Sequence, residues 1–125
     1  MKNGLVIADS EPIFSLALID RLDLLNSLLD AIKIPQAVWD KISSHDSKPF
    51  HHSICHYFKD KVEQINGFND LTFEMDYGES QSVILYNELQ ADFLLIDDKK
   101  ARSFAENLGI NCIGTIGLLS ISKDK

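Results

Sequence analysis

Four acidic side chains lie near the ends of apolar runs or at the start of a helical stretch. In chain order they are Asp9 after Leu5–Ala8, Glu79 in Tyr77–Ser80, and the pair Asp97 and Asp98 after 93–96. An open parallel sheet binds ligands at the carboxyl ends of its strands, so carboxylates from distant parts of the chain can meet there. Hard divalent ions such as Mg²⁺ and Mn²⁺ prefer oxygen ligands. The pattern therefore predicts a divalent metal site, and such a site can activate water for phosphodiester hydrolysis.

Each acid also has a purely structural interpretation. Asp9 and Asp98 stand where they could cap the helices that follow, which contributes about 0.5–2 kcal/mol, and spacing leaves capping and metal binding equally open at both. Glu79 in a first helical turn is favoured by the helix dipole alone. Asp97 is harder to explain in this way, because a carboxylate directly after a buried apolar run is costly unless it is paired or bound to metal.

The elements that must position these acids alternate between strands and helices. Continuous apolar runs predict buried strands at 5–8 and 91–96, with shorter strands at 32–34 and 110–113. Helical spacing of apolar residues predicts helices over 13–22, 24–29, 35–42, 54–65, 79–89 and 99–108. We expect a loop over 43–53, a marginal edge strand over 71–73 and a short apolar segment after 114–117. The alternation predicts a single α/β domain over residues 1–125, with helices on both faces of a mainly parallel sheet.

Composition narrows the possible functions. The chain has 125 residues, of which 45% are hydrophobic, and this favours one globular domain. Its formal net charge of −7 argues against binding nucleic acid through bulk positive potential, although it does not exclude a nuclease. No run approaches the roughly 18 apolar residues of a membrane span, and no export signal is evident. We therefore expect a cytoplasmic protein in which Cys55 and Cys112 are reduced.

Five motifs follow one another along nearly the whole chain, namely Val6–Ile13, Ile34–Trp39, Gly78-Glu79, Leu94–Arg102 and Gly114–Gly117. Together they resemble the PIN domain, in particular its VapC-like branch of predicted nucleic-acid-binding proteins. The resemblance implies a three-layer α/β/α sandwich and a metal-dependent ribonuclease that cleaves single-stranded RNA, often the toxin of a toxin–antitoxin pair. The partners it implies are single-stranded RNA, a cognate antitoxin and a second copy of the chain.

The same resemblance assigns roles to individual residues. By position, Asp9, Glu79 and Asp97 would hold Mg²⁺ or Mn²⁺, and Asp98 would be a further ligand or would position a metal-bound water. Thr115 would line the same pocket with its hydroxyl. Ser10 would donate to a ligand carboxylate or to a substrate phosphate, unless it only caps a helix.

Three features depart from the family pattern. Lys41 stands where the family usually has an acid, and Gln81 replaces the second carboxylate of the common Gly-Glu-x-Glu motif. Relatives usually continue further after 114–117, so we expect a shortened C-terminal element whose exposed edge self-association or a partner would cover. These departures favour an alternative, a catalytically weakened PIN remnant that binds RNA or a partner. A receiver-like phosphoacceptor is disfavoured, because its acidic pair would follow the first strand.

A histidine-rich stretch forms a separate candidate site. His52 and His56 are four residues apart, as are His51 and Cys55, and this spacing places each pair on one helical face. A structural zinc site normally has four ligands, and no second Cys/His pair lies nearby. We therefore favour a solvated face or a contact with RNA or a partner over zinc.

Overall fold

The computed structural model describes residues 4–44, 50–67 and 75–123, so the strand predicted over 71–73 lies outside the described residues. In the part that is described, no helix has the length and apolarity to cross a membrane. Strands and helices alternate in the order β1 (Leu5–Ala8), α1 (Ser10–Leu18), α2 (Asp23–Leu28), β2 (Ala31–Pro35), α3 (Gln36–Ser43), α4 (His51–Phe58), β3 (Val62–Glu63), α5 (Tyr77–Leu89), β4 (Phe93–Leu95), α6 (Lys99–Asn107), β5 (Cys112–Ile113) and α7 (Thr115–Lys123).

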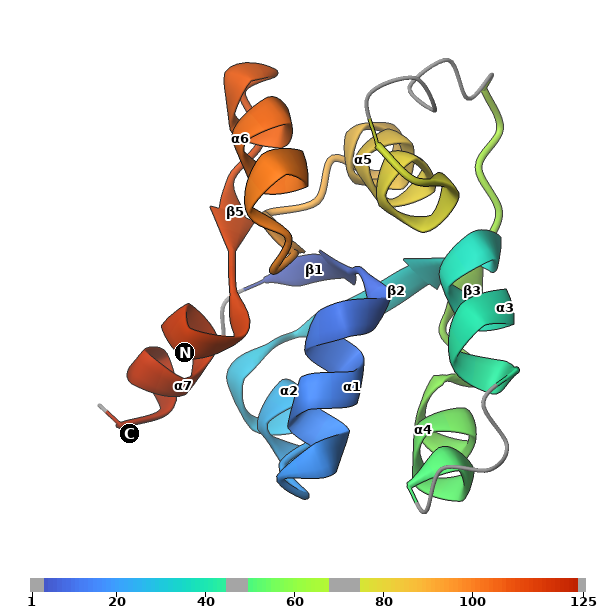
Figure 1. Cartoon of the computed structure of the whole chain (residues 1–125), viewed down its shortest axis with the longest axis vertical. Helices are drawn as coiled ribbons and strands as arrows, with labels where there is room; N and C mark the ends of the chain where they lie inside the picture. The colour runs from blue at the N-terminus through green and yellow to red at the C-terminus, as the bar shows by residue number, and fades with distance from the viewer. Residues whose placement is uncertain (1–3, 45–49, 68–74, 124–125) are drawn as a thin grey trace.

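The five strands form one parallel sheet in the order β3-β2-β1-β4-β5. The chain moves outward from β1 through β2 to β3 and then returns to the opposite side of β1 with β4 (Figure 1). The strand order therefore reverses between β1 and β4, which is where open α/β sheets bind ligands. Ala8 is opposite Leu95 in this pair, so the residues that follow the two strands emerge side by side.

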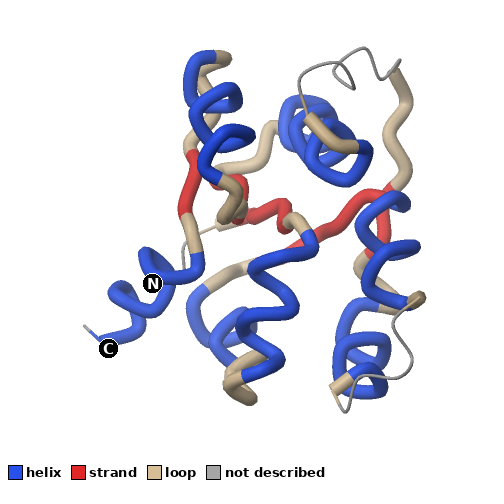
Figure 2. The backbone as a smooth tube through the Cα atoms, viewed as in Figure 1, coloured by secondary structure: helices blue, strands red, loops and turns tan. Residues whose placement is uncertain are grey.

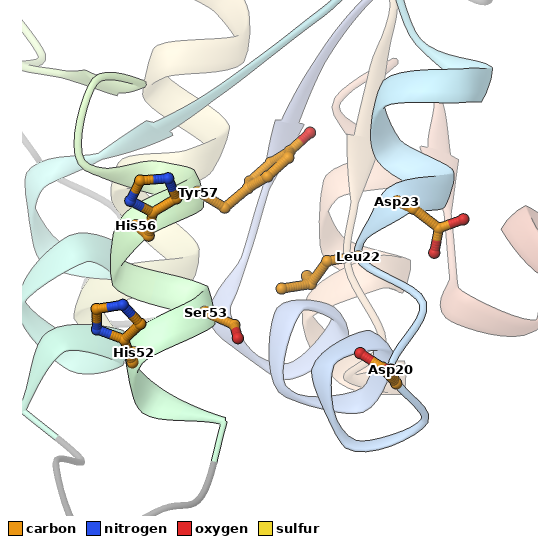
Figure 3. Close-up of a pocket in the computed structure, with 7 residues that line it drawn as sticks. All are labelled: Asp20, Leu22, Asp23, His52, Ser53, His56 and Tyr57. Carbon is orange, nitrogen blue, oxygen red and sulfur yellow. The ribbon is translucent and has the colours of Figure 1, made fainter.

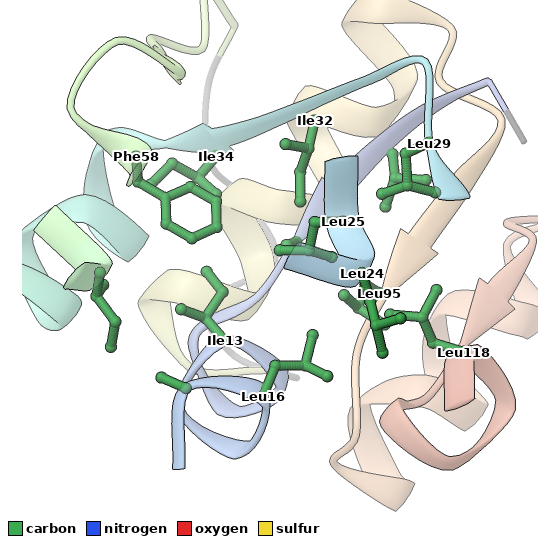
Figure 4. Packing of buried hydrophobic residues seen from close by; sticks show 14 of the residues in the cluster. Ile13, Leu16, Leu24, Leu25, Leu29, Ile32, Ile34, Phe58, Leu95 and Leu118 are labelled. Atoms are coloured by element: carbon green, nitrogen blue, oxygen red, sulfur yellow. The ribbon is translucent and has the colours of Figure 1, made fainter. Parts of the chain in front are cut away.

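Helices cover both faces of the sheet, and the alternation of side chains along β1 divides the core in two. Val6 and Ala8 join a cluster with residues of α1, α2, α3, α4 and α7, part of which is drawn in Figure 4. Ile7 points to the other face and packs with residues of α5 and α6. Figure 2 shows the strands running between helices on either side. The prediction of a three-layer α/β/α sandwich is thereby confirmed.

The single helix predicted over 54–65 is wrong at both ends. α4 begins at His51 and ends at Phe58, after which Val62 pairs with Ile34 of β2. The predicted helix is too long because Val62 follows Phe58 at helical spacing. In the structure the backbone of Val62 pairs instead with the edge of β2. The apolar segment predicted after 114–117 forms α7.

Candidate active site

Asp9 lies at the point where the strand order reverses. Its backbone N–H donates to the Leu95 carbonyl at 2.9 Å, which holds it against β4. Only 3% of its surface is exposed. Asp9 occupies the N-cap position of α1, yet its side chain makes no capping hydrogen bond. Among the described residues, neither its Oδ1 nor the buried Ser10 hydroxyl has a hydrogen-bond partner. The position of Asp9 is therefore not explained by helix capping.

Burial raises the pKa of Asp9 from 3.8 to about 7, because desolvation penalises the charged carboxylate. The neighbouring carboxylates of Glu79 and Asp76 raise this pKa further. The Ser10 backbone N–H and the Lys41 ammonium oppose the increase. A buried anion with an unpartnered oxygen is the kind of group that a bound cation would stabilise.

The start of α5 brings two more carboxylates next to Asp9. A Cβ atom placed on Gly78 would lie 3.5 Å from Asp9 Oδ1, so the first turn of α5 is in contact with that carboxylate. The Glu79 N–H donates to Asp76 Oδ1 at 2.8 Å, and the Asp76 N–H donates to Glu79 Oε1 at 3.1 Å. This reciprocal capping box fixes the buried Glu79 at the helix start.

Desolvation also raises the pKa of Glu79, and the charges of Asp76, Asp98 and Glu11 add to this effect. The acids therefore interact electrostatically although they come from three separate parts of the chain, the starts of α1, α5 and α6. Asp76 and Glu11 are the members of this group that the sequence prediction did not include. The spacing Asp-x-x-Glu from Asp76 to Glu79 is a capping-box pattern and could have identified Asp76.

Asp97 connects the end of β4 to the start of α7. The Thr115 backbone N–H donates to Asp97 Oδ1 and the Thr115 hydroxyl donates to Oδ2, each at 2.7 Å. Short hydrogen bonds to a carboxylate are among the stronger ones in proteins. The Thr115 hydroxyl thus contacts Asp97, one of the predicted ligands. These bonds supply the partner that a carboxylate after a buried strand requires.

Asp98 behaves differently from Asp97 although the two are adjacent. Its Oδ2 accepts from the Ala101 N–H at 2.9 Å, so Asp98 is the N-cap of α6. Its charge still contributes to the raised pKa of Glu79. Of the two acids for which sequence left capping and metal binding equally open, Asp98 is a cap and Asp9 is not.

Two of the three departures from the family pattern, Lys41 and Gln81, make specific contacts in the structure. The Lys41 Nζ lies 3.7 Å from Asp76 Oδ2, and its charge also reaches Asp9. The Gln81 side chain points elsewhere, because its Oε1 accepts from the buried Ala37 N–H at 3.0 Å. Lys41 therefore adds positive charge to the acidic cluster. Gln81 supplies a hydrogen-bond acceptor for a backbone N–H in the first turn of α3.

The donor set can be compared with the needs of a divalent ion. Within 4–44, 50–67 and 75–123, no three His, Cys, Asp or Glu side chains form a group that could hold a metal by themselves. Mg²⁺ keeps several waters and is often bound through only one or two carboxylates. Asp9 offers an unpartnered oxygen, and the hydrogen-bonded carboxylates of Glu79 and Asp97 retain further lone pairs. The residues present fit a hydrated hard ion anchored at Asp9.

The histidines lie at a different place in the fold. The His52 and His56 rings are stacked with centroids 6.3 Å apart, and His51 Nε2 lies 3.5 Å from Cys55 Sγ. Figure 3 shows the His52 and His56 rings on α4, on the side of a pocket opposite Asp20 and Asp23. These rings are separate from the acids at the ends of β1 and β4.

Comparison with known proteins places this chain in a family. A family model described as a PIN domain matches residues 5–125. A solved structure described as a domain of a functionally unknown protein from Methanocaldococcus jannaschii DSM 2661 shares the fold, with a TM-score of 0.56 and 17% sequence identity. The alignment covers 88% of this chain and 89% of the other. A comparison with curated proteins found no match. PIN domains are generally nucleases that use divalent metals, and this chain belongs to the PIN-domain family.

Proposed function

We propose that this PIN domain is a metal-dependent endoribonuclease that cleaves single-stranded RNA. The observation that carries the proposal is Asp9, a buried carboxylate at the reversal of strand order, one oxygen of which has no hydrogen-bond partner among the described residues. In this proposal Asp9, Glu79 and Asp97 hold Mg²⁺ or Mn²⁺, and Asp98 is an auxiliary at the start of α6. Such an ion would stabilise the charge that develops on the phosphodiester and activate the attacking water.

The chain's own residues prepare the site for this chemistry. The capping box with Asp76 fixes Glu79 beside Asp9, and Thr115 holds both oxygens of Asp97. The Ser10 hydroxyl, which has no hydrogen-bond partner in the described part of the chain, is available to donate to a ligand carboxylate or to a substrate phosphate. Burial of Asp9 excludes water from one side of the site and strengthens its interaction with a cation.

We further propose that the protein is the toxin of a toxin–antitoxin pair and that its antitoxin covers the acidic site. Family membership supports this proposal in general terms, because the VapC-like branch contains such toxins. Co-expression with the product of an adjacent small reading frame tests it. The expected result is a stable complex in which cleavage is suppressed, whereas unchanged cleavage in a mixture with that product would count against the toxin role.

The nuclease proposal is tested by cleavage assays on purified protein. We expect cleavage of single-stranded RNA with Mn²⁺ or Mg²⁺, loss of cleavage with chelator and recovery when excess Mn²⁺ is added. Asp9→Asn should lower the rate by about 100-fold or more, since the metal contributes several kcal/mol to transition-state stabilisation. Asp23→Asn, at an exposed position of α2, is the matched control and should cleave like the wild type. Wild-type protein that neither cleaves RNA nor binds a divalent ion would overturn the proposal.

A second candidate function is a non-catalytic PIN domain that binds RNA or a partner. The specific observation in its favour is the Lys41–Asp76 ion pair, which places an ammonium where the resembling family usually has an acid. The use of Gln81 as an acceptor for Ala37 also removes one potential metal ligand. In this case the protein would bind RNA but would not cleave it in Mn²⁺.

Lys41→Glu distinguishes the two candidates. Replacing a cation by an anion beside Asp76 should tighten Mn²⁺ binding by about tenfold, since the charge change in partly exposed surroundings is worth on the order of 1–2 kcal/mol. Isothermal titration measures this affinity, and Lys59→Glu, at the exposed end of α4, is the control for net charge. If the protein is a nuclease, the wild type already binds Mn²⁺. If it is a non-catalytic PIN domain, only Lys41→Glu binds Mn²⁺. Equal affinities in both variants would show that Lys41 does not act on the metal site.

A further inference from the structure

A groove of about 640 Å³ lies directly beside Asp97. It is bordered by the second half of α1, the first turns of α6 and the start of α7. Asp97 and Thr115 line this groove and also belong to the candidate active site. The groove is therefore continuous with the acids at the strand ends, and its size is in the range of ligand-binding pockets.

Arg102 brings a positive charge into this groove. A Cβ atom on Gly114 would lie 2.9 Å from Arg102 Nη1 and 3.0 Å from Asp97 Oδ1, so a larger residue at this position would push the two groups away. The Arg102 Nε is 4.0 Å from Glu106 Oε2, at the limit of an ion pair, and the side chain is 41% exposed. Gly114 thus leaves space for a partly exposed guanidinium close to Asp97.

Other residues that line the groove are apolar although they are exposed to solvent. Ile116 at the start of α7 is 78% exposed and Ile19 after α1 is 50% exposed. Both line the groove together with Leu119. A ligand that suits this surface combines an anionic group for Arg102 with an apolar face for the isoleucines. A nucleotide has both, in its phosphate and in its base.

We propose that the groove binds the nucleotide next to the cleaved phosphodiester, with Arg102 on its phosphate and Ile116 and Ile19 against its base or ribose. This inference rests on the proposed function and adds the position of the substrate. The guanidinium can bind phosphate through two parallel hydrogen bonds. A chain with a formal net charge of −7 has little bulk attraction for RNA, so individual cations near the site must provide phosphate contacts. Arg102 is thus a substrate-positioning residue.

Binding is measured by fluorescence anisotropy with a labelled single-stranded oligouridine in the presence of chelator, so that the RNA stays intact. Arg102→Ala should weaken binding by about tenfold or more, as expected for loss of a charged hydrogen bond. The slope of log affinity against log salt should fall by about 0.7. Ile116→Ser should weaken binding by about threefold, as expected for lost apolar contact. Lys100→Ala, which removes an exposed charge from the same helix, is the matched control and should change binding by less than about twofold.

Cleavage kinetics in Mn²⁺ provide the second readout. Arg102→Ala should raise KM much more than it lowers kcat, and Arg102→Lys should recover part of the affinity, which a merely structural role would not predict. Binding that depends on Arg102 in a protein without cleavage would support the groove and overturn the nuclease. Cleavage with unchanged affinity and KM in Arg102→Ala would support the nuclease and overturn the groove. A change in oligomeric state by light scattering without a change in RNA binding would make the groove a protein interface and also overturn the inference.

Discussion

Asp9→Asn is expected to stabilise the metal-free protein above pH 7 while it lowers the rate of cleavage by about 100-fold or more. Asp9 is buried, its Oδ1 has no partner among the described residues, and desolvation raises its pKa from 3.8 to about 7. An amide at this position carries no charge and offers N–H donors to the nearby carboxylates of Glu79 and Asp76. Asp9 is thus expected to lower the stability of the metal-free protein, as is common for residues whose charge is buried for the sake of function.

The pH dependence follows from the direction of the pKa shift. The folded protein binds the Asp9 proton more tightly than the unfolded chain does, so stability decreases as pH rises from about 4 to about 7. Below about pH 4 Asp9 is protonated in both the folded and the unfolded protein, so it does not lower stability. Above about pH 7 it is charged in both states, and its burial lowers the stability of the folded state by the full amount. The pKa shift corresponds to a loss of at most about 4 kcal/mol in the free energy of unfolding, and local relaxation around the charge reduces this loss. We therefore expect the free energy of unfolding of Asp9→Asn at pH 8 to exceed that of the wild type by about 1–3 kcal/mol.

Urea unfolding of metal-free protein at pH 5 and pH 8 measures this gain. The wild type should lose stability between the two values, and Asp9→Asn should lose less, with a residual slope from Glu79, whose pKa is raised in the same direction. Mn²⁺ should stabilise the wild type at pH 8 but not Asp9→Asn. Asp23→Asn serves again as the surface control. If the free energy of unfolding changes equally with pH in the wild type and in Asp9→Asn, the charge of Asp9 does not destabilise the folded protein.

The positions of Asp9, Asp97 and Asp98 at the strand ends could be predicted from sequence, because the reversal of strand order brings the ends of two apolar runs together. Val6 and Ile7 in β1, like Leu94 and Leu95 in β4, are buried on opposite faces, and such strands are recognisable from continuous apolar residues alone. The residues that follow these strands must then lie at one edge of the sheet. Which of them is free to bind a cation depends on individual hydrogen bonds.

Those hydrogen bonds could not be predicted from residue types. Asp9 and Asp98 both follow apolar strands and precede helices, but only Asp98 accepts a capping hydrogen bond. Asp76 was missed because it follows no apolar run and belongs to the cluster only through the helix that begins after it. The short strand containing Val62 was also missed, because two residues are too few for any periodicity.

Asp97 is expected to have two separable roles, and substitutions at Asp97 and Thr115 distinguish them. Asp97→Ala removes two 2.7 Å hydrogen bonds and leaves the buried Thr115 without its acceptors. We expect a loss of about 3–5 kcal/mol, since hydrogen bonds to charged groups are worth about 1.5–3 kcal/mol each. The loss should also weaken the docking of α7, whose Leu118 packs in the core.

Asp97→Asn should preserve the fold and lower activity, which makes it the more informative substitution. Its Oδ1 can still accept from the Thr115 N–H, and its amide can donate to the Thr115 hydroxyl oxygen, so we expect stability within about 1 kcal/mol of the wild type. The negative charge is lost, and cleavage in Mn²⁺ should fall by about 100-fold. Thr115→Val is the complementary control, because it removes one hydrogen bond and keeps the Asp97 charge. Urea unfolding and cleavage rates measured on the three variants separate the roles. If Asp97→Asn cleaves RNA like the wild type, Asp97 serves only to hold α7, and the cation must be bound by Asp9 and its neighbours at the start of α5.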